Sequence, residues 1–172
     1  MNSKVLISAC LLGECCRYDG ASKPNDIACR LFAANRDRMV PVCPEMLGGL
    51  PQPRTASEID AASEELRVIG AAGEDRTEAF VRGAEACLYI AEEANCRMAI
   101  MKAKSPSCGT GRVYDGSFTG TLISGDGVAS GLLKRAGITV IDERLLAQLD
   151  ETGCLDDLFD RPDAVCSHVH GA

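Results

Sequence analysis

The chain has 172 residues with 25 acidic and 18 basic side chains, a formal net charge of −7, and 46% hydrophobic residues. A chain of this length can form one domain that buries about two-thirds of its unfolded surface without disulfides. The acidic balance argues against a broad nucleic-acid surface, because such a surface requires clustered Lys and Arg. No window approaches the roughly 18 apolar residues that span a bilayer. We therefore expect a protein that acts on a small molecule and has no membrane partner.

Short apolar runs alternate with amphipathic segments along the chain. In chain order, the pattern predicts a strand at 4–9, a helix at 25–37, a strand at 39–42, a helix at 74–95, a strand at 98–101, a helix at 127–135, a strand at 138–141 and a helix at 142–149. Asn25 or Asp26 can cap the first helix, while Asp126 and Gly137 flank the third. The alternation predicts a three-layer α/β, Rossmann-like domain with a mostly parallel sheet, and we assign residues 1–150 to it.

The segments between these elements have the composition of loops. Residues 48–54 are rich in Gly and Pro and predict a loop over one edge of the site, and residues 113–120 have the turn residues of an irregular hairpin. Residues 58–69 are compatible with a helix or with a strand. We expect residues 151–172 to form a partly disordered tail, in which Cys166-Ser-His-Val-His170 either binds zinc or copper or belongs to a flexible segment.

Ten cysteines are the most unusual feature of the composition. The apolar run 5–13 is followed at once by Glu14 and Arg17, which is typical of a first strand and not of a signal peptide. We therefore expect a cytoplasmic protein, whose cysteines are thiols or metal ligands and not disulfides. Cys29 and Cys87 lie within predicted helices, and we interpret both as small core residues.

Three cysteines share one position relative to the predicted strands. Cys10, Cys43 and Cys108 each lie at or shortly after the end of a strand, and the carboxyl ends of parallel strands are where open α/β sheets place their chemistry. Pro106 excludes a helix before Cys108, and Gly109 lets the backbone approach a bulky group. We expect the three thiols to converge on a bound group. The alternative is that they are unrelated thiols in loops.

The spacing of these thiols bears on what they bind. Structural zinc sites recruit four ligands in paired short spacings, and the three cysteines do not form such pairs. A [4Fe-4S] cluster is held by thiolates and tolerates dispersed ligands. Three ligands leave one iron open, and an open iron is a Lewis acid that favours catalysis. An iron-sulfur sensor or carrier without a substrate and a zinc-stabilised binding module remain as alternatives.

Several motifs in the same order resemble those of the thiouracil desulfurase family. They are Ser8-Ala9-Cys10-Leu11-Leu12-Gly13, Cys16-Arg17-Tyr18-Asp19-Gly20, Pro41-Val42-Cys43-Pro44-Glu45, Leu47-Gly48-Gly49-Leu50-Pro51 with Pro53-Arg54, Lys104-Ser105-Pro106-Ser107-Cys108-Gly109, and Gly125-Asp126-Gly127-Val128. The resemblance covers roughly residues 4–142. It implies a single α/β domain that holds a [4Fe-4S] cluster through Cys10, Cys43 and Cys108.

The resemblance also implies an activity, which is the non-redox desulfuration of thiolated uracil, as thiouracil or a thiouridine nucleotide, to uracil. The sulfur is then captured on the open iron of the cluster, and a small thiolated pyrimidine is the expected partner. Glu45 matches the acid/base glutamate of the family. Ser105 matches its catalytic serine, and Ser107 is an alternative for contact with the pyrimidine. Oligomeric state is not predicted.

Three further residues are candidates near this site. Arg54 and Lys104 can hold an anionic group such as a nucleotide phosphate, or they are solvated surface charges. Cys16 is either a neighbour of the cluster or a fourth ligand, with Cys15 the weaker candidate. The Gly125-x-Gly127 sequence lacks the third glycine of a dinucleotide-binding fingerprint, so NAD binding is not expected.

Overall fold

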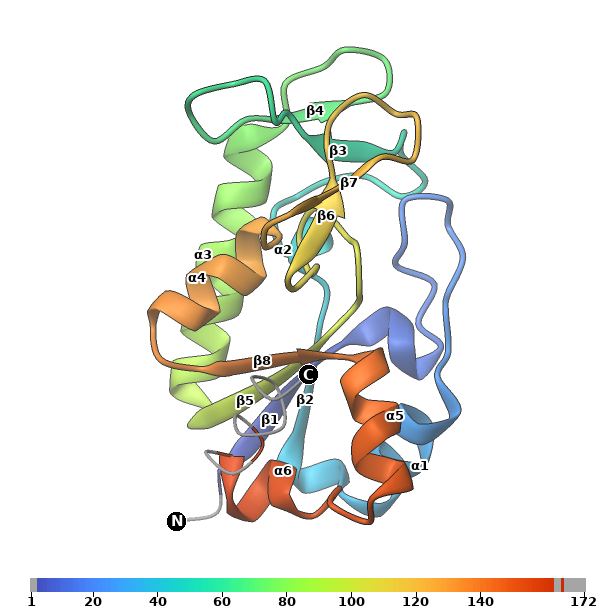
Figure 1. Ribbon diagram of the computed structural model, residues 1–172, viewed down its shortest axis with the longest axis vertical. Helices are drawn as coiled ribbons and strands as arrows, with labels where there is room; N and C mark the ends of the chain where they lie inside the picture. Colours follow the sequence, from blue (N-terminus) through green and yellow to red (C-terminus); the bar gives the residue numbers. More distant parts are fainter. Residues whose placement is uncertain (1–2, 163–164, 166–172) are drawn as a thin grey trace.

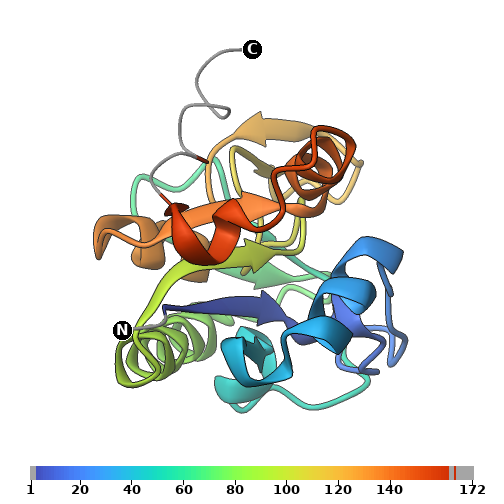
Figure 2. The same ribbon diagram turned by 90° about the horizontal axis from the view of Figure 1, so that it is seen from below.

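Four parallel strands form the central sheet of the computed structural model, which describes residues 3–162 and residue 165. The strands are β1 (Lys4–Ser8), β2 (Met39–Val42), β5 (Cys96–Met101) and β8 (Thr139–Asp142), in the spatial order β2-β1-β5-β8. Figure 2 shows β1, β5 and β8 side by side with the same direction. The chain leaves β1 for β2 on one side and later crosses to β5 on the other. This crossing places a topological switch point between β1 and β5.

Side chains of β1 and β5 alternate between two apolar layers. Val5 and Ile7 face one layer and Leu6 faces the other, and all three side chains are fully buried. The first layer packs on α1 (Asp26–Ala34) and α5 (Glu143–Glu151), and the second packs on α3 (Thr77–Glu93) and α4 (Val128–Arg135). Helices therefore cover both faces of the sheet, as Figure 1 shows. The predicted three-layer α/β fold is confirmed.

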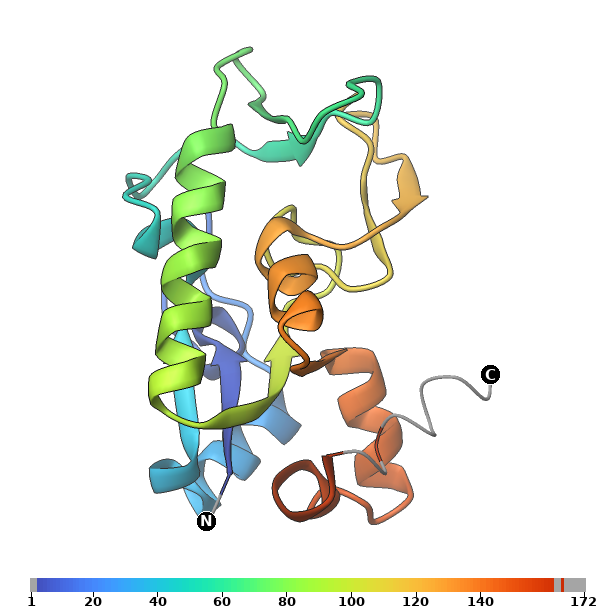
Figure 3. The same cartoon turned by 90° about the vertical axis from the view of Figure 1, so that its left-hand side faces the viewer.

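Two antiparallel hairpins extend beyond the carboxyl ends of the sheet strands (Figure 3). The first pairs β3 (Ser57–Ile59) with β4 (Val68–Gly70), which resolves the segment that was compatible with a helix or a strand. The second pairs β6 (Arg112–Tyr114) with β7 (Leu122–Ser124), where an irregular hairpin was predicted. The buried Glu58 carboxylate joins them by accepting hydrogen bonds from the backbone N–H groups of Gly116 and Phe118, both at 3.0 Å. The hairpins thus form one wall over the end of the sheet.

The short elements and helix caps complete the path of the chain. The short elements are η1 (Ala9–Leu12), η2 (Arg36–Arg38), α2 (Pro44–Leu47) and α6 (Asp157–Asp160). Asn25 caps α1 by accepting from the N–H of Ala28 at 2.9 Å, which is one of the two predicted caps. Asp126 does not cap α4, because its carboxylate accepts from the N–H of Gly111 at 2.8 Å and pairs with Lys134 at 2.7 Å.

In the described part of the expected tail, apolar side chains pack against the α/β layers, while the boundary at residue 150 stays a prediction. Leu158 and Phe159 on α6, together with Val165, are buried in the apolar layer that also holds α1 and α5. Burial of each large apolar side chain contributes about 1.5–3 kcal/mol, so this segment is part of the domain. Cys166 and His170 lie outside the described residues. Among residues 3–162 and 165, no helix is both long and apolar enough to cross a membrane.

Candidate active site

Cys10, Cys43 and Cys108 lie at the rim of the sheet, by which we mean the segments that directly follow β1, β2 and β5. Cys10 is in η1, Cys43 is the N-cap residue of α2, and Cys108 is in the loop after β5. These three strands are neighbours in the sheet, so the segments that follow them meet. All three side chains line one cavity of about 430 Å³. A volume of this size is typical of small-molecule sites.

The cavity combines thiols, charged groups and two aromatic rings. Its polar and aromatic lining residues are Ser8, Cys10, Cys16, Arg17, Tyr18, Cys43, Glu45, Arg54, Ser57, Glu58, Lys102, Lys104, Ser105, Cys108 and Tyr114. The apolar part of the lining comes mainly from the small side chains that follow the strands. Residues from both hairpins contribute, so the wall over the end of the sheet also closes the cavity.

The loop that carries Cys108 is clamped by the start of α4. The N–H groups of Val128 and Ala129 donate to the carbonyls of Pro106 and Ser107, both at 2.9 Å. A Cβ at Gly127 would lie 2.5 Å from the carbonyl carbon and oxygen of Ser107, so only glycine permits this approach. Gly127 therefore serves close packing against the cysteine loop.

The two serines of this loop differ in position. Ser105 lines the cavity, and its Oγ accepts hydrogen bonds from the N–H groups of Ser107 and Cys108, both at 3.1 Å. These bonds occupy the acceptor side of the hydroxyl and leave its proton to donate. Ser107 is fully buried and is not among the cavity-lining residues. The expected contact of Ser107 with a pyrimidine is therefore not supported by its position.

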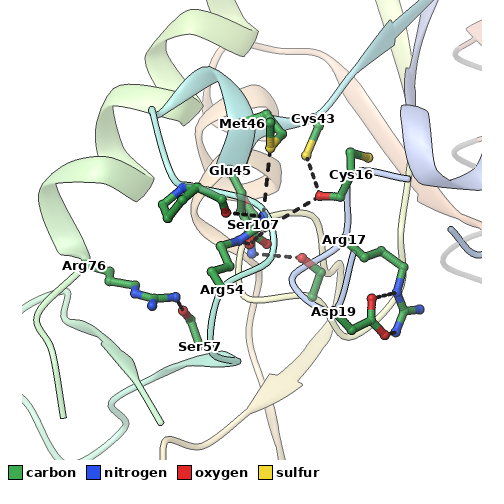
Figure 4. A network of polar contacts seen from close by, with 12 residues as sticks. Cys16, Arg17, Asp19, Cys43, Glu45, Met46, Arg54, Ser57, Arg76 and Ser107 are labelled. Atoms are coloured by element: carbon green, nitrogen blue, oxygen red, sulfur yellow. Dashed lines mark hydrogen bonds and ion pairs between the residues drawn. The ribbon is translucent and has the colours of Figure 1, made fainter. Parts of the chain in front are cut away.

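Glu45 and Arg54 form a buried ion pair at the cavity wall. Arg54 Nε and Nη2 donate to Glu45 Oε2 at 2.8 and 2.6 Å, and the exposed fractions of the two side chains are 1% for Arg54 and 14% for Glu45. Arg54 Nη2 also donates to the carbonyl of Cys16 at 3.3 Å, and Nη1 donates to that of Pro51 at 3.1 Å (Figure 4). All three guanidinium nitrogens are thus engaged by the protein. Arg54 is thus not a solvated surface charge, and its binding of an anionic substrate group stays a prediction.

Cys16 lies between two of the predicted ligands. Cys16 has an exposed fraction of 8% and lies near the thiols of Cys10 and Cys43, and the Cys43 thiol donates to the Cys16 carbonyl at 3.7 Å. Contact with Cys10, together with burial, raises the pKa of the Cys16 thiol to about 11. Contact with Cys16, followed by burial, raises the pKa of Cys43, and burial raises that of Cys108. Cys15, by contrast, is exposed and does not line the cavity.

Lys104 is the exposed cation of the cavity mouth. It lines the cavity and has a positive φ of 65°, which fixes the sharp turn between β5 and the cysteine loop. Tyr18, with an exposed fraction of 42%, and Tyr114 contribute aromatic rings to the same lining. Lys102, two residues earlier and directly after β5, instead forms an ion pair with Glu143.

Sequence reasoning did not identify Ser8 or Glu58 as cavity residues. Ser8 belongs to the motif that contains Cys10. Its position at the end of the first predicted strand could have identified it as a cavity residue. Glu58 lies in a segment that was compatible with a helix or with a strand, so the sequence did not predict which way its side chain points. Cys87 and Cys29 do not line the cavity. Cys87 is fully buried, as expected of a core residue, whereas Cys29 is only partly buried.

Comparisons with known proteins agree with this arrangement. The sequence profile of the 2-thiouracil desulfurase family matches residues 5–144. An uncharacterized protein of Bacillus subtilis (strain 168), YbbK, is 40% identical over 148 residues, which cover 83% of this chain and 97% of YbbK. A solved structure of the [4Fe-4S]-dependent thiouracil desulfidase TudS superposes with a TM-score of 0.77 at 40% identity, covering 89% of this chain and 99% of TudS. The chain belongs to the 2-thiouracil desulfurase family.

Proposed function

We propose that this protein is a [4Fe-4S]-dependent enzyme that removes sulfur from thiolated uracil and releases uracil without net redox change. The observation that carries the proposal is the convergence of Cys10, Cys43 and Cys108 on one cavity that also holds Glu45 and Ser105. The name of the TudS structure and the family membership support the same cofactor and substrate.

The donor set fits this cofactor. Thiolates are the ligands of iron-sulfur clusters, and the three thiols are all on segments whose direction is fixed by the sheet. The pKa values of Cys43 and Cys108 are raised by thiol contact and by burial, so their thiolates need a nearby cation. A bound metal group supplies that charge and deprotonates coordinating thiols. When bound, the cluster supplies an open iron that acts as a Lewis acid toward the thiocarbonyl sulfur.

Glu45 is placed to move a proton. Both hydrogen bonds from Arg54 go to Oε2, which leaves Oε1 to accept the proton of a water that attacks the C–S carbon. Attack by the water oxygen forms the C–O bond while one electron pair of the C=S bond moves to sulfur, and Oε1 takes the first water proton. The second water proton passes to sulfur as the remaining C–S bond breaks with its electron pair on sulfur, which forms the C=O of uracil, and Glu45 returns the first proton to solvent. The products are uracil and hydrosulfide. General base assistance of this kind contributes about 10²- to 10⁴-fold to a rate.

Ser105 is placed to orient the pyrimidine. Two backbone N–H groups hold its oxygen, so its hydroxyl proton has a fixed direction and is available to a carbonyl or ring nitrogen of the substrate. Lys104 at the mouth is the more exposed of the two candidates, Arg54 and Lys104, for an anionic group on a nucleotide substrate. The nine cysteines described as free are thiols, and a reducing compartment maintains that state, so we also propose a cytoplasmic location.

Turnover under anaerobic conditions tests the proposal. Protein purified without oxygen and supplied with thiouracil is expected to convert it to uracil, which is followed by the loss of thiocarbonyl absorbance and the appearance of hydrosulfide. A protein with a cluster that undergoes reversible redox change but yields no uracil would instead be a sensor or carrier. A colourless protein that unfolds on chelation would be a zinc-stabilised module.

A further inference from the structure

Glu58 is a buried carboxylate of the cavity that the mechanism above does not use. It is the central residue of β3, has an exposed fraction of 8%, and lines the same cavity as the thiols of the rim. A carboxylate that is removed from water requires hydrogen-bond donors, and any oxygen that lacks them is ready to accept from a ligand. The donors around each of the two oxygens therefore indicate what the cavity binds.

The two oxygens of Glu58 have different surroundings. Oε2 accepts hydrogen bonds from the N–H groups of Gly116 and Phe118, both at 3.0 Å. Oε1 has no hydrogen-bond or ion-pair partner among residues 3–162 and 165. Within the same residues, the fully enclosed side-chain atoms that lack a partner are Arg38 Nε and Ser107 Oγ, so Oε1 is not enclosed. The cavity that Glu58 lines supplies the accessible space at Oε1.

The hairpins hold this carboxylate in place. Glu58 pairs with Ile69 in the first hairpin, and its Oε2 is held by the loop of the second. Arg76, the N-cap residue of α3, donates to the carbonyl of Thr55 at 2.8 Å and to the hydroxyl of Ser57 at 2.9 Å (Figure 4 shows the bond to Ser57). The strand that carries Glu58 is thus tied to both of its neighbours. Oε1 is therefore a preorganised acceptor.

The chemistry of the pyrimidine ring gives this acceptor a function. An ionised carboxylate accepts hydrogen bonds and donates none. Thiolated uracil has one ring donor in every form that the proposed function includes, which is the N3–H between C2 and C4, whereas N1–H is replaced by the sugar in a nucleotide. Thiolated cytosine has a lone pair at N3, which a carboxylate repels. A buried acceptor that meets N3 therefore favours the uracil ring over the cytosine ring.

We propose that Glu58 is a specificity-determining residue whose Oε1 accepts the N3–H of the thiolated pyrimidine and selects thiouracil over thiocytosine. This inference rests on the proposed function. Ser105 complements Glu58, because its hydroxyl proton is left to donate. The cavity thus offers an acceptor and a donor to a ring edge that carries N3–H beside a carbonyl oxygen. Proton transfer stays with Glu45.

Glu58→Gln replaces the acceptor by a donor and retains the hydrogen bonds of the hairpin. The N–H groups of Gly116 and Phe118 require an acceptor, so the amide oxygen takes the position of Oε2 and the NH₂ group takes that of Oε1. We expect kcat/KM for 2-thiouracil to fall about 10- to 100-fold, because a hydrogen bond to a charged group is lost and two donors then face each other. The kcat/KM for 2-thiocytosine is expected to rise.

Glu74→Gln is the matched control on the same hairpin. The Glu74 carboxylate forms an ion pair with Arg76 and is not among the cavity-lining residues, so this variant loosens the support of β3 without changing the cavity. The ratio of kcat/KM for 2-thiouracil to that for 2-thiocytosine is expected to fall at least about 10-fold in Glu58→Gln and to keep its wild-type value in Glu74→Gln. An unchanged ratio in Glu58→Gln, or an equal change in both variants, would overturn the inference.

Product binding to the wild-type holoenzyme covers the case in which Glu58→Gln does not fold. Uracil retains N3–H and cytosine lacks it, so we expect uracil to bind at least about 10-fold more tightly than cytosine in anaerobic titration calorimetry. Equal affinities would contradict the inference. Wild-type protein that turns over thiouracil and shows equal affinities leaves the proposed function intact, whereas wild-type protein that binds no cluster and turns over no thiouracil rejects both.

Discussion

Cys108 at the rim of the sheet and Cys87 in the middle of α3 are both buried, with exposed fractions of 6% and 0%. Burial raises the pKa of both thiols, to about 12 for Cys87. The two cysteines differ in what surrounds them. Both belong to the same apolar layer, but Cys108 also lines the cavity together with three other thiols, whereas Cys87 does not line it. Burial and a raised pKa are common to both thiols, so the position at the end of a strand is what distinguishes the proposed ligand Cys108 from Cys87.

The same contrast holds for the backbone around each cysteine. The loop of Cys108 is held by hydrogen bonds from the first turn of α4 and by a glycine contact that excludes a Cβ. Cys87 is held by a regular helix, in which many side chains are compatible with the backbone. Substitutions should therefore have local chemical effects at the rim and small packing effects in the helix.

The largest expected effect is the loss of the cofactor. Cys108→Ala, Cys43→Ala and Cys10→Ala each remove one of three thiolate ligands, so we expect protein without a stoichiometric cluster and without thiouracil turnover. Iron and sulfide content per chain is the measurement. Cys87→Ala is the matched control and should keep the cluster. Full iron content in Cys108→Ala would contradict the proposal that Cys108 is a ligand. Loss of iron in Cys87→Ala would contradict the interpretation of Cys87 as a core residue.

Glu45→Ala separates cluster binding from catalysis. The variant keeps all three thiols, so iron content should equal that of the wild type, while turnover should fall by about 10²- to 10⁴-fold because the proton acceptor is lost. Iron analysis and initial rates on the same sample check both statements. A variant with a full cluster and wild-type turnover removes Glu45 from the mechanism.

Gly127→Ala tests the clamp on the cysteine loop. The new Cβ would meet the Ser107 backbone at 2.5 Å, so we expect a loss of about 1–3 kcal/mol in the free energy of unfolding, as for other overpacked sites. Gly131→Ala, on the same helix, meets the flexible end of Arg135 at 3.3 Å and Asp126 Cβ at an ordinary contact distance of 3.7 Å. That variant should be neutral or gain about 0.5–1 kcal/mol. Denaturant unfolding of both variants measures the two free energies of unfolding. Equal values would contradict the clamp.

The smallest effect is expected for the core cysteine itself. Cys87→Ala removes one sulfur atom from an apolar layer, and a loss of about 1 kcal/mol in the free energy of unfolding is expected, comparable to deletion of a methylene group or two. Thermal unfolding at constant pH measures it. A loss as large as that of a missing ligand would show that Cys87 has a role beyond packing.

The sequence predicted those parts of the site that depend on strand ends. Cys10, Cys43 and Cys108 could be placed together because parallel strands carry their carboxyl ends to one edge. The role expected for Glu45 came from the family resemblance, and the structure places its side chain in the lining of the same cavity. The ion pair of Arg54 with Glu45 was not predicted, because it depends on how a Pro- and Gly-rich loop folds back on α2, and no periodicity encodes that.

Other differences have similar physical reasons. Ser107 and Ser105 are two residues apart in a loop without regular alternation, so sequence alone did not show which one lines the cavity. The segment with Leu158 and Phe159 is too short for a helical period to emerge, and its burial depends on contacts with residues far away in the chain. The sheet and the long helices were predictable because their apolar periods repeat several times.

The most direct test of this account is native mass spectrometry of the full chain purified without oxygen. We predict a mass increment of one [4Fe-4S] cluster in the wild type and in Cys87→Ala, and no such increment in Cys108→Ala. An increment of a single zinc ion, or none after reconstitution with iron and sulfide, would contradict the central claim that the thiols at the rim hold a catalytic cluster.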